Sequence, residues 1–192
     1  WYYTDKETNE EKTTTTYSTG DFYLCGDPNP DLYGGFGTSI TFHGFDLSTQ
    51  FSYLVGGLTY DYGYAGMMGN PTATSVGNRW HKDVLKAWSP ENPSSTIPRW
   101  YFNDLNTTGS SDRFLIDGSY LNLQNIQVGY TLPDSWTSHL KIKNLRLYFV
   151  CDNVYYWSKR KGLDPRRSIS GVGTSGKIAP FRTYSGGISL QF

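Results

Sequence analysis

The sequence has no excess charge of either sign, since 17 basic residues are matched by 17 acidic ones. No stripe of lysine and arginine stands out, so nucleic acid is not expected as a partner. The only two cysteines, Cys25 and Cys151, are spaced for neither a disulfide framework nor a metal site, and we expect both to be unpaired. No hydrophobic run is long enough for a membrane-spanning helix.

The sequence also lacks a candidate for catalysis. His43, His81 and His139 stand in separate turns or loops, without cysteine or acidic residues at metal-ligand spacing. No serine lies in a nucleophile elbow, and no pair of carboxylates falls on one face. We therefore expect no enzyme, no cofactor and no metal.

Strand-forming and turn-forming residues dominate instead. Aromatic residues make up 17% of the 192 residues, with 16 tyrosines and 21 glycines but only two methionines. This bias favours strands and turns over helices. The composition therefore predicts an all-β protein.

Five segments alternate apolar and polar side chains with the period of a strand, at about 32–42, 45–55, 120–132, 145–157 and 182–192. The first two flank His43-Gly44, where glycine suits the positive φ of a tight hairpin turn. In the third, the apolar residues change parity near Gln124-Asn125. Either a β-bulge lies there or the upper part of the strand has left the apolar belt.

The last strand is apolar on one face up to the final residue, so the chain end itself is expected to be structural. Its apolar face includes Tyr184, Ile188, Leu190 and Phe192. The other strands carry polar side chains on the opposite parity. This polar set consists of Asp46, Ser48, Gln50, Ser52, Gln127, Arg146, Tyr148 and Asp152.

The connections between the strands are unequal. Long loops at about 1–31, 56–119 and 158–181 alternate with a two-residue turn and a turn of about ten residues. A loop of about sixty residues is uncommon in a compact domain. Outer-membrane barrels, however, have short periplasmic turns and longer extracellular loops. The pattern predicts an antiparallel transmembrane β-barrel segment with its apolar faces in the lipid bilayer and the polar set facing the lumen.

Aromatic residues in the long loops are candidates for contact with a substrate or a partner: Trp80, Trp88, Trp100 and Tyr101. Their flat faces offer contact area at low entropic cost. Trp80 and Trp88 also bracket a helix-like piece and are equally able to pack the loop onto itself. The polar set has a similar alternative, contact with a plug or with water.

Several runs resemble consecutive blocks at the C-terminal end of SusC/RagA-type TonB-dependent outer-membrane transporters of Bacteroidota. These runs are GDPNPDLYGGFGTSITFHGFDLSTQFSY, DGSYLNLQNIQVGYTLP, NLRLYFVCDNVYYW and GLDP…FRTYSGGISLQF. The resemblance implies a 22-stranded barrel with an N-terminal plug. It also implies import of oligosaccharides or oligopeptides together with a SusD-like surface lipoprotein, energised through TonB.

Five strands cannot close such a barrel, so the remaining barrel strands and the plug are expected outside this chain. TonB is expected to act through the missing N-terminal part. By the same resemblance, the terminal strand ending at Phe192 is a signal for the barrel-assembly machinery, and the C-terminus is periplasmic. Two other hypotheses remain open: a soluble, aromatic-rich, carbohydrate-binding β-sandwich and a small autonomous porin.

Overall fold

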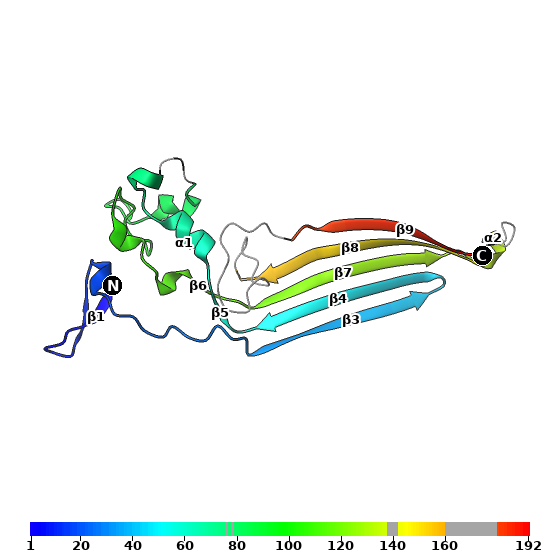
Figure 1. The fold of residues 1–192 in the computed structure, drawn as a ribbon, viewed down its shortest axis with the longest axis horizontal. Helices are drawn as coiled ribbons and strands as arrows, with labels where there is room; N and C mark the ends of the chain where they lie inside the picture. Colours follow the sequence, from blue (N-terminus) through cyan, green and yellow to red (C-terminus); the bar gives the residue numbers. More distant parts are fainter. Residues whose placement is uncertain (76, 78, 138–141, 160–179) are drawn as a thin grey trace. The chain divides into compact units, whose positions relative to one another are not determined.

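The computed structural model describes residues 1–75, 77, 79–137, 142–159 and 180–192 (Figure 1). The described residues form two units. The sheet unit comprises residues 28–59, 117–137, 142–159 and 180–192, and the loop unit comprises residues 1–27 and 60–116. Part of the loop predicted at 158–181, together with His139, lies outside the described residues.

The sheet unit is a five-stranded antiparallel sheet in the order β3-β4-β7-β8-β9 (Figure 1). Its strands are β3 (Leu32–Phe42), β4 (Phe45–Val55), β7 (Tyr120–Thr131), β8 (Asn144–Ser158) and β9 (Thr183–Gln191). The order of the strands in the sheet is their order in the chain, and each pairs antiparallel with the next. This arrangement confirms the predicted all-β antiparallel class. A short helix, α2 (Asp134–Thr137), begins the connection between β7 and β8.

The tightest connection in the sheet is the two-residue turn between β3 and β4, and its backbone angles explain the residues found there. His43 and Gly44 have φ values of 47° and 84°, the two positive values that a type I′ hairpin turn requires. Gly44 also lies against the neighbouring strand, where its carbonyl accepts a hydrogen bond from Thr131 N–H at 2.7 Å. A Cβ at position 44 would lie 2.6 Å from Thr131 O. Both the backbone angle and the close approach therefore favour glycine.

A β-bulge in β7 confirms the explanation proposed for its change of parity. Gln50 of β4 pairs with Asn125 and Phe51 pairs with Leu123, so Gln124 is the extra residue. On the β8 side, Asn153 takes a positive φ of 51° at the same level. The bulge keeps the apolar residues before and after it on one face of the sheet.

The loop unit contains short elements in place of a structureless loop. Its N-terminal part forms a hairpin of β1 (Tyr2–Thr4) and β2 (Glu11–Thr13). The remaining elements are η1 (Tyr17–Thr19), α1 (Tyr62–Met68), η2 (Ala73–Ser75), η3 (Lys82–Lys86), η4 (Leu105–Thr107) and η5 (Asp112–Phe114). The 58–117 segment begins with strand β5 (Leu58–Tyr60) and ends with strand β6 (Leu115–Asp117), and these two strands pair with each other.

The helix-like piece predicted at Trp80–Trp88 was wrong in extent. The structure has only the 3-10 helix η3, because the backbone at His81 and Ala87, on either side, is not helical, with ψ values of 145° and 155°. Neither tryptophan lies on the helix. Phe114, the most buried apolar residue of the loop unit, is contacted edge-on by the rings of Tyr60 and Tyr64.

Among the described residues, no helix is both long and apolar enough to cross a membrane.

Candidate functional site

One face of the sheet is apolar and exposed. A register row runs straight across it through Phe42, Phe45, Tyr130, Leu147 and Ile188. Phe42 and Ile188, at the two edges, are 68% and 66% exposed. We call this surface the apolar face; its other large exposed members include Phe36, Ile40, Leu47, Val128, Phe149, Tyr155, Trp157, Tyr184 and Leu190.

A surface of this kind marks contact with a membrane or another apolar partner. A β-sandwich would bury the apolar face beneath a second sheet about 10 Å away. The other sheets in the described part of the chain have strands of only three residues, too short to cover it. The described residues therefore do not form a β-sandwich.

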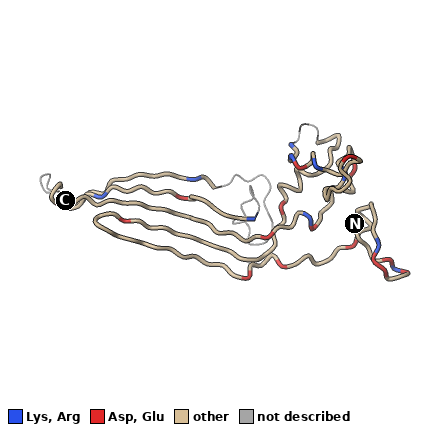
Figure 2. Tube along the Cα trace, turned by 180° about the vertical axis from the view of Figure 1, so that it is seen from behind, with Lys and Arg blue, Asp and Glu red and all other residues tan. Residues whose placement is uncertain are grey.

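The opposite face, the polar face, carries all eight residues of the polar set predicted from the sequence. Register pairs such as Ser48 with Gln127 and Gln50 with Asn125 place them on one side of the sheet. Charged residues are few along the five strands (Figure 2). They are Asp46, Arg146 and Asp152, and all three belong to the polar face.

Two of these charges neutralise each other across an intervening strand. Arg146 of β8 donates from Nε to Asp46 Oδ1 at 3.0 Å and from Nη2 to Asp46 Oδ2 at 2.5 Å. Strand β7 lies between them, and the pair passes over Gly129. A Cβ at position 129 would collide with Asp46 Oδ1 and lie 2.6 Å from Arg146 Nη2. The missing side chain of Gly129 therefore makes the ion pair possible.

Similar contacts tie the other strands of the polar face. Tyr148 lies over Gly187 of β9, where a Cβ would collide with the phenol ring. Near the bulge in β7, Asn125 donates to Asp152 Oδ1 at 2.7 Å. The third charged residue of the polar face, Asp152, therefore has a neutral partner. Sequence reasoning found the charged residues but missed Gly129, Gly187 and Asn125. Glycine at a polar-parity position of a strand was the available signal.

The end of the sheet that carries the long loop is held by a further ion pair. Lys159 Nζ lies 2.6 Å from Asp117 Oδ2, and Ser119 N–H donates to Asp117 Oδ1 at 2.8 Å. The Lys159 ammonium and the Ser119 donors lower the pKa of Asp117 to about 2. Ser119 Oγ also accepts a hydrogen bond from Gly56 N–H. Asp117 therefore stays ionised and joins the ends of three strands.

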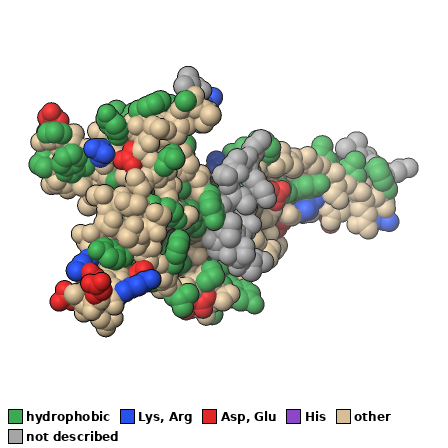
Figure 3. All heavy atoms as spheres, turned by 60° about the vertical axis from the view of Figure 1, so that its left-hand side comes forward, with side chains coloured by type: hydrophobic (Ala, Val, Ile, Leu, Met, Phe, Trp, Pro, Cys, Tyr) green, Lys and Arg blue, Asp and Glu red, His purple; other side chains and the backbone are tan. Residues whose placement is uncertain are grey.

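Two of the four loop aromatics are bound to the loop's own backbone. The indole Nε1–H groups of Trp80 and Trp100 both donate to Gly69 O, at 3.0 and 3.1 Å, and their rings meet edge to face at 5.6 Å. Trp88 and Tyr101 are more available, with 43% and 61% of their surfaces exposed. Hydrophobic side chains gather on the surface of the loop unit (Figure 3).

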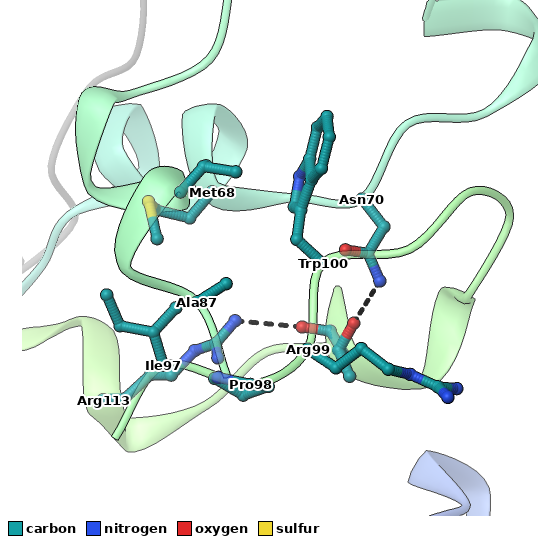
Figure 4. A pocket seen from close by; sticks show the side chains of 10 residues that line it. Met68, Asn70, Ala87, Ile97, Pro98, Arg99, Trp100 and Arg113 are labelled. Atoms are coloured by element: carbon teal, nitrogen blue, oxygen red, sulfur yellow. Dashed lines mark hydrogen bonds between the residues drawn. The ribbon is translucent and has the colours of Figure 1, made fainter. Parts of the chain in front are cut away.

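A small cavity lies beside Trp100 (Figure 4). Its volume is about 10 Å³, which is room for about one water molecule. Asn70 Nδ2 donates to Asp104 O at 2.7 Å and Arg113 Nη2 donates to Thr107 O at 2.9 Å along its wall. Burial lowers the pKa of Arg113. The cavity is too small for a sugar ring or a peptide side chain, so it is a packing feature of the loop.

The terminal strand presents its predicted residues on the apolar face. Ile188 and Leu190 pair with Leu147 and Leu145 of β8, and Tyr184 stacks on Phe149 at 6.1 Å between ring centroids. Phe192 follows the end of β9 and is exposed. In the described residues β9 pairs only with β8, as β3 pairs only with β4.

Comparison with known proteins finds relatives that are several times longer than this chain. No protein-family model matches the sequence. The TonB-dependent receptor P3 of Formosa agariphila is 30% identical over 185 residues, covering 91% of this chain and 18% of that receptor. The TonB-dependent receptor SusC of Bacteroides thetaiotaomicron is 27% identical over 180 residues, covering 92% of this chain and 17% of SusC.

The fold is also found in solved structures. The RagAB peptide transporter superposes with a TM-score of 0.76 at 22% identity, over 99% of this chain and 20% of that chain. The closed-closed state of the RagAB peptide importer gives a TM-score of 0.73 at 26% identity, over 100% of this chain and 21% of that chain.

The two-faced antiparallel sheet and these likenesses define the class of the chain as a segment of a transmembrane β-barrel wall. The chain is similar in sequence to TonB-dependent receptors, SusC among them, and it spans about a fifth of the length of the relatives it matches.

Proposed function

We propose that this chain is part of the barrel wall of a TonB-dependent importer in the outer membrane of a Gram-negative bacterium. The importer takes up oligosaccharides or oligopeptides together with a SusD-like surface lipoprotein. The observation that carries the proposal is the sheet with an exposed apolar face on one side and, on the other, a polar face that contains the Asp46–Arg146 ion pair.

The size of the strands supports this role. Strands β3 and β4 have 11 residues each, and at about 3.4 Å per residue and a tilt of about 45° they would rise about 26 Å along the membrane normal. Barrels of this class have an apolar band about 25 Å tall. The apolar face therefore has the height needed to meet the hydrocarbon core of the bilayer.

Orientation follows from the connections. The two-residue turn at His43-Gly44 and the C-terminus lie at the same end of the sheet, because β9 runs in the direction of β3. Since short turns are periplasmic in this class, the C-terminus is periplasmic and the 58–117 segment extracellular. The outer edges of β3 and β9 would pair with the remaining barrel strands. The polar face would meet the plug. TonB would act through the N-terminal part outside this chain.

The terminal strand has a second role during biogenesis. Tyr184, Ile188 and Leu190 lie on the apolar face of β9, and the exposed ring of Phe192 follows the strand. We propose that these residues are the signal read by the barrel-assembly machinery.

The substrate or lipoprotein contacts are assigned to the loop unit. Of the four candidate aromatics, Trp88 and Tyr101 are the more exposed, whereas the indole N–H groups of Trp80 and Trp100 donate to Gly69 O. RagAB, whose structure superposes on this chain, is a peptide transporter, and this likeness favours a peptide as the first cargo to test.

The test is uptake by cells that carry or lack the full-length receptor gene. Fluorescent oligopeptides and oligosaccharides are supplied with and without a protonophore that removes the energy for TonB. The proposal expects uptake of one cargo class that requires both the receptor and the energy source. Uptake that needs the receptor but survives the protonophore would instead support a porin, and uptake independent of the receptor would refute transport altogether.

A further inference from the structure

One nitrogen atom in the loop unit, Nδ1 of His81, faces two different partners. Asp83 N–H donates to this nitrogen at 3.2 Å, so the imidazole caps η3. Asp83 Oδ2 lies 3.1 Å from the same nitrogen. An imidazole nitrogen accepts a hydrogen bond when it has no proton and donates one when it has. The two contacts therefore require different protonation states.

The surroundings keep the carboxylate ready to receive a proton donor. From α1, Tyr64 O–H donates to Asp83 Oδ2 at 3.0 Å, and its ring meets the imidazole edge-on at 4.8 Å. From η3, Lys86 Nζ lies 3.1 Å from Asp83 Oδ1. The Lys86 ammonium, with a smaller contribution from Tyr64, lowers the pKa of Asp83. Asp83 is therefore an anion over the range in which histidines usually titrate.

We propose that His81 is a pH-dependent switch in the loop unit. The neutral imidazole accepts from Asp83 N–H and caps the first turn of η3. The imidazolium donates from Nδ1 to Asp83 Oδ2, and Asp83 N–H loses its acceptor. The same carboxylate is then shared between His81 and Lys86.

Protonation changes the surface that η3 presents. The helix gains one positive charge, its cap is lost, and Lys86, whose side chain is 71% exposed, must share its counter-ion. Leu85 on the same helix is 91% exposed. Acidification thus alters both the charge and the order of an exposed apolar segment. The contacts all lie within the loop unit, so the switch does not depend on the cargo or direction of transport.

Hydrogen exchange of the full-length receptor in detergent tests the switch. Mass spectrometry follows peptides that cover residues 80–88 from pH 8 to pH 5, after correction for the chemical exchange rate. We expect Asp83 N–H to exchange about fivefold faster at the acid end, the effect of losing one cap. His81→Asn retains a capping acceptor that does not titrate, and should remove the pH dependence. His43→Asn, at a positive φ that asparagine tolerates, should leave it unchanged.

A wild-type protein whose protection at 80–88 does not change with pH would overturn the switch, as would a His81→Asn variant with the wild-type pH dependence. If His81→Asn loses protection throughout α1, His81→Ser provides the second test, because serine is also a capping acceptor that does not titrate. Exchange at 80–88 in this variant should not change with pH. A change equal to that of the wild-type protein would contradict the proposed exchange of partners.

Discussion

Replacing Gly129 by alanine should break an ion pair between two strands that it does not itself belong to. Asp46 on β4 and Arg146 on β8 meet above β7 only because position 129 has no side chain. The added methyl group does not strike backbone atoms, since the nearest atoms are the ends of the two charged side chains. These side chains can move away, and the cost of the substitution is then the loss of their contact.

The magnitude follows from the setting of the pair. The side chains of Arg146 and Asp46 are 28% and 24% exposed, so the pair lies between a surface ion pair and a buried one. A hydrogen bond to a charged group contributes about 1.5–3 kcal/mol, and an exposed pair about 0.2–1 kcal/mol. We therefore expect Gly129→Ala to cost about 1–2 kcal/mol.

The assay is amide hydrogen exchange of the full-length receptor, in peptides that cover residues 125–131 and 144–150. A loss of about 1–2 kcal/mol from local opening corresponds to roughly 5- to 30-fold faster exchange. Gly186→Ala is the matched control, because the nearest atom to its new Cβ is 3.9 Å away. This control should exchange at the wild-type rate.

A double-mutant cycle separates the ion pair from any direct effect of the methyl group. In the background Asp46→Ala with Arg146→Ala, the pair no longer exists and Gly129→Ala should be nearly neutral. An equal cost of Gly129→Ala in both backgrounds would refute the role assigned to the ion pair.

Three further changes test other parts of the structure. Trp100→Phe keeps an aromatic ring but removes one of the two indole donors to Gly69 O. It should destabilise the loop unit by about 1 kcal/mol, measured as faster tryptic cleavage, whereas Trp88→Phe should have little effect. The pKa of Asp117 is lowered from 3.8 to about 2, so its contribution is complete above about pH 4 and is lost as the pH falls towards 2; Asp117→Asn should remove this acid sensitivity of the loop base in a pepsin digestion series. Phe192→Ala should reduce the heat-modifiable, assembled form of the receptor on gels, whereas Gln191→Ala, on the other face, should not.

Local patterns in the sequence were sufficient to predict the sheet. Side-chain alternation located the strands. The change of parity in β7 left a bulge as one of two explanations, and the structure has that bulge at Gln124. His43-Gly44 gave the type I′ turn because only a few residue types tolerate its two positive φ values. These features depend on neighbours in sequence, so no knowledge of distant contacts was needed.

The contacts across the polar face were not predictable in the same way. Asp46 and Arg146 are 100 residues apart, and their pairing depends on the absence of a side chain on a third strand. The loop unit posed the same difficulty, because Trp1 Nε1 donates to Asn106 O over a separation of 105 residues. The helix-like piece expected at Trp80–Trp88 was too long, because the non-helical backbone at His81 and Ala87 limits the helix to Lys82–Lys86.

Accessibility of spin labels on the two faces of the sheet tests the central claim most directly. Single nitroxides are placed at Leu47 or Ile188 on the apolar face and at Ser48 or Ser185 on the polar face of the full-length receptor in lipid nanodiscs. Because oxygen concentrates in the hydrocarbon core and a polar nickel chelate stays in water, a barrel wall predicts high oxygen and low nickel collision rates for the first two positions. Equal rates on both faces, or higher nickel access at Leu47 and Ile188, would contradict the assignment of this chain as a membrane-embedded wall.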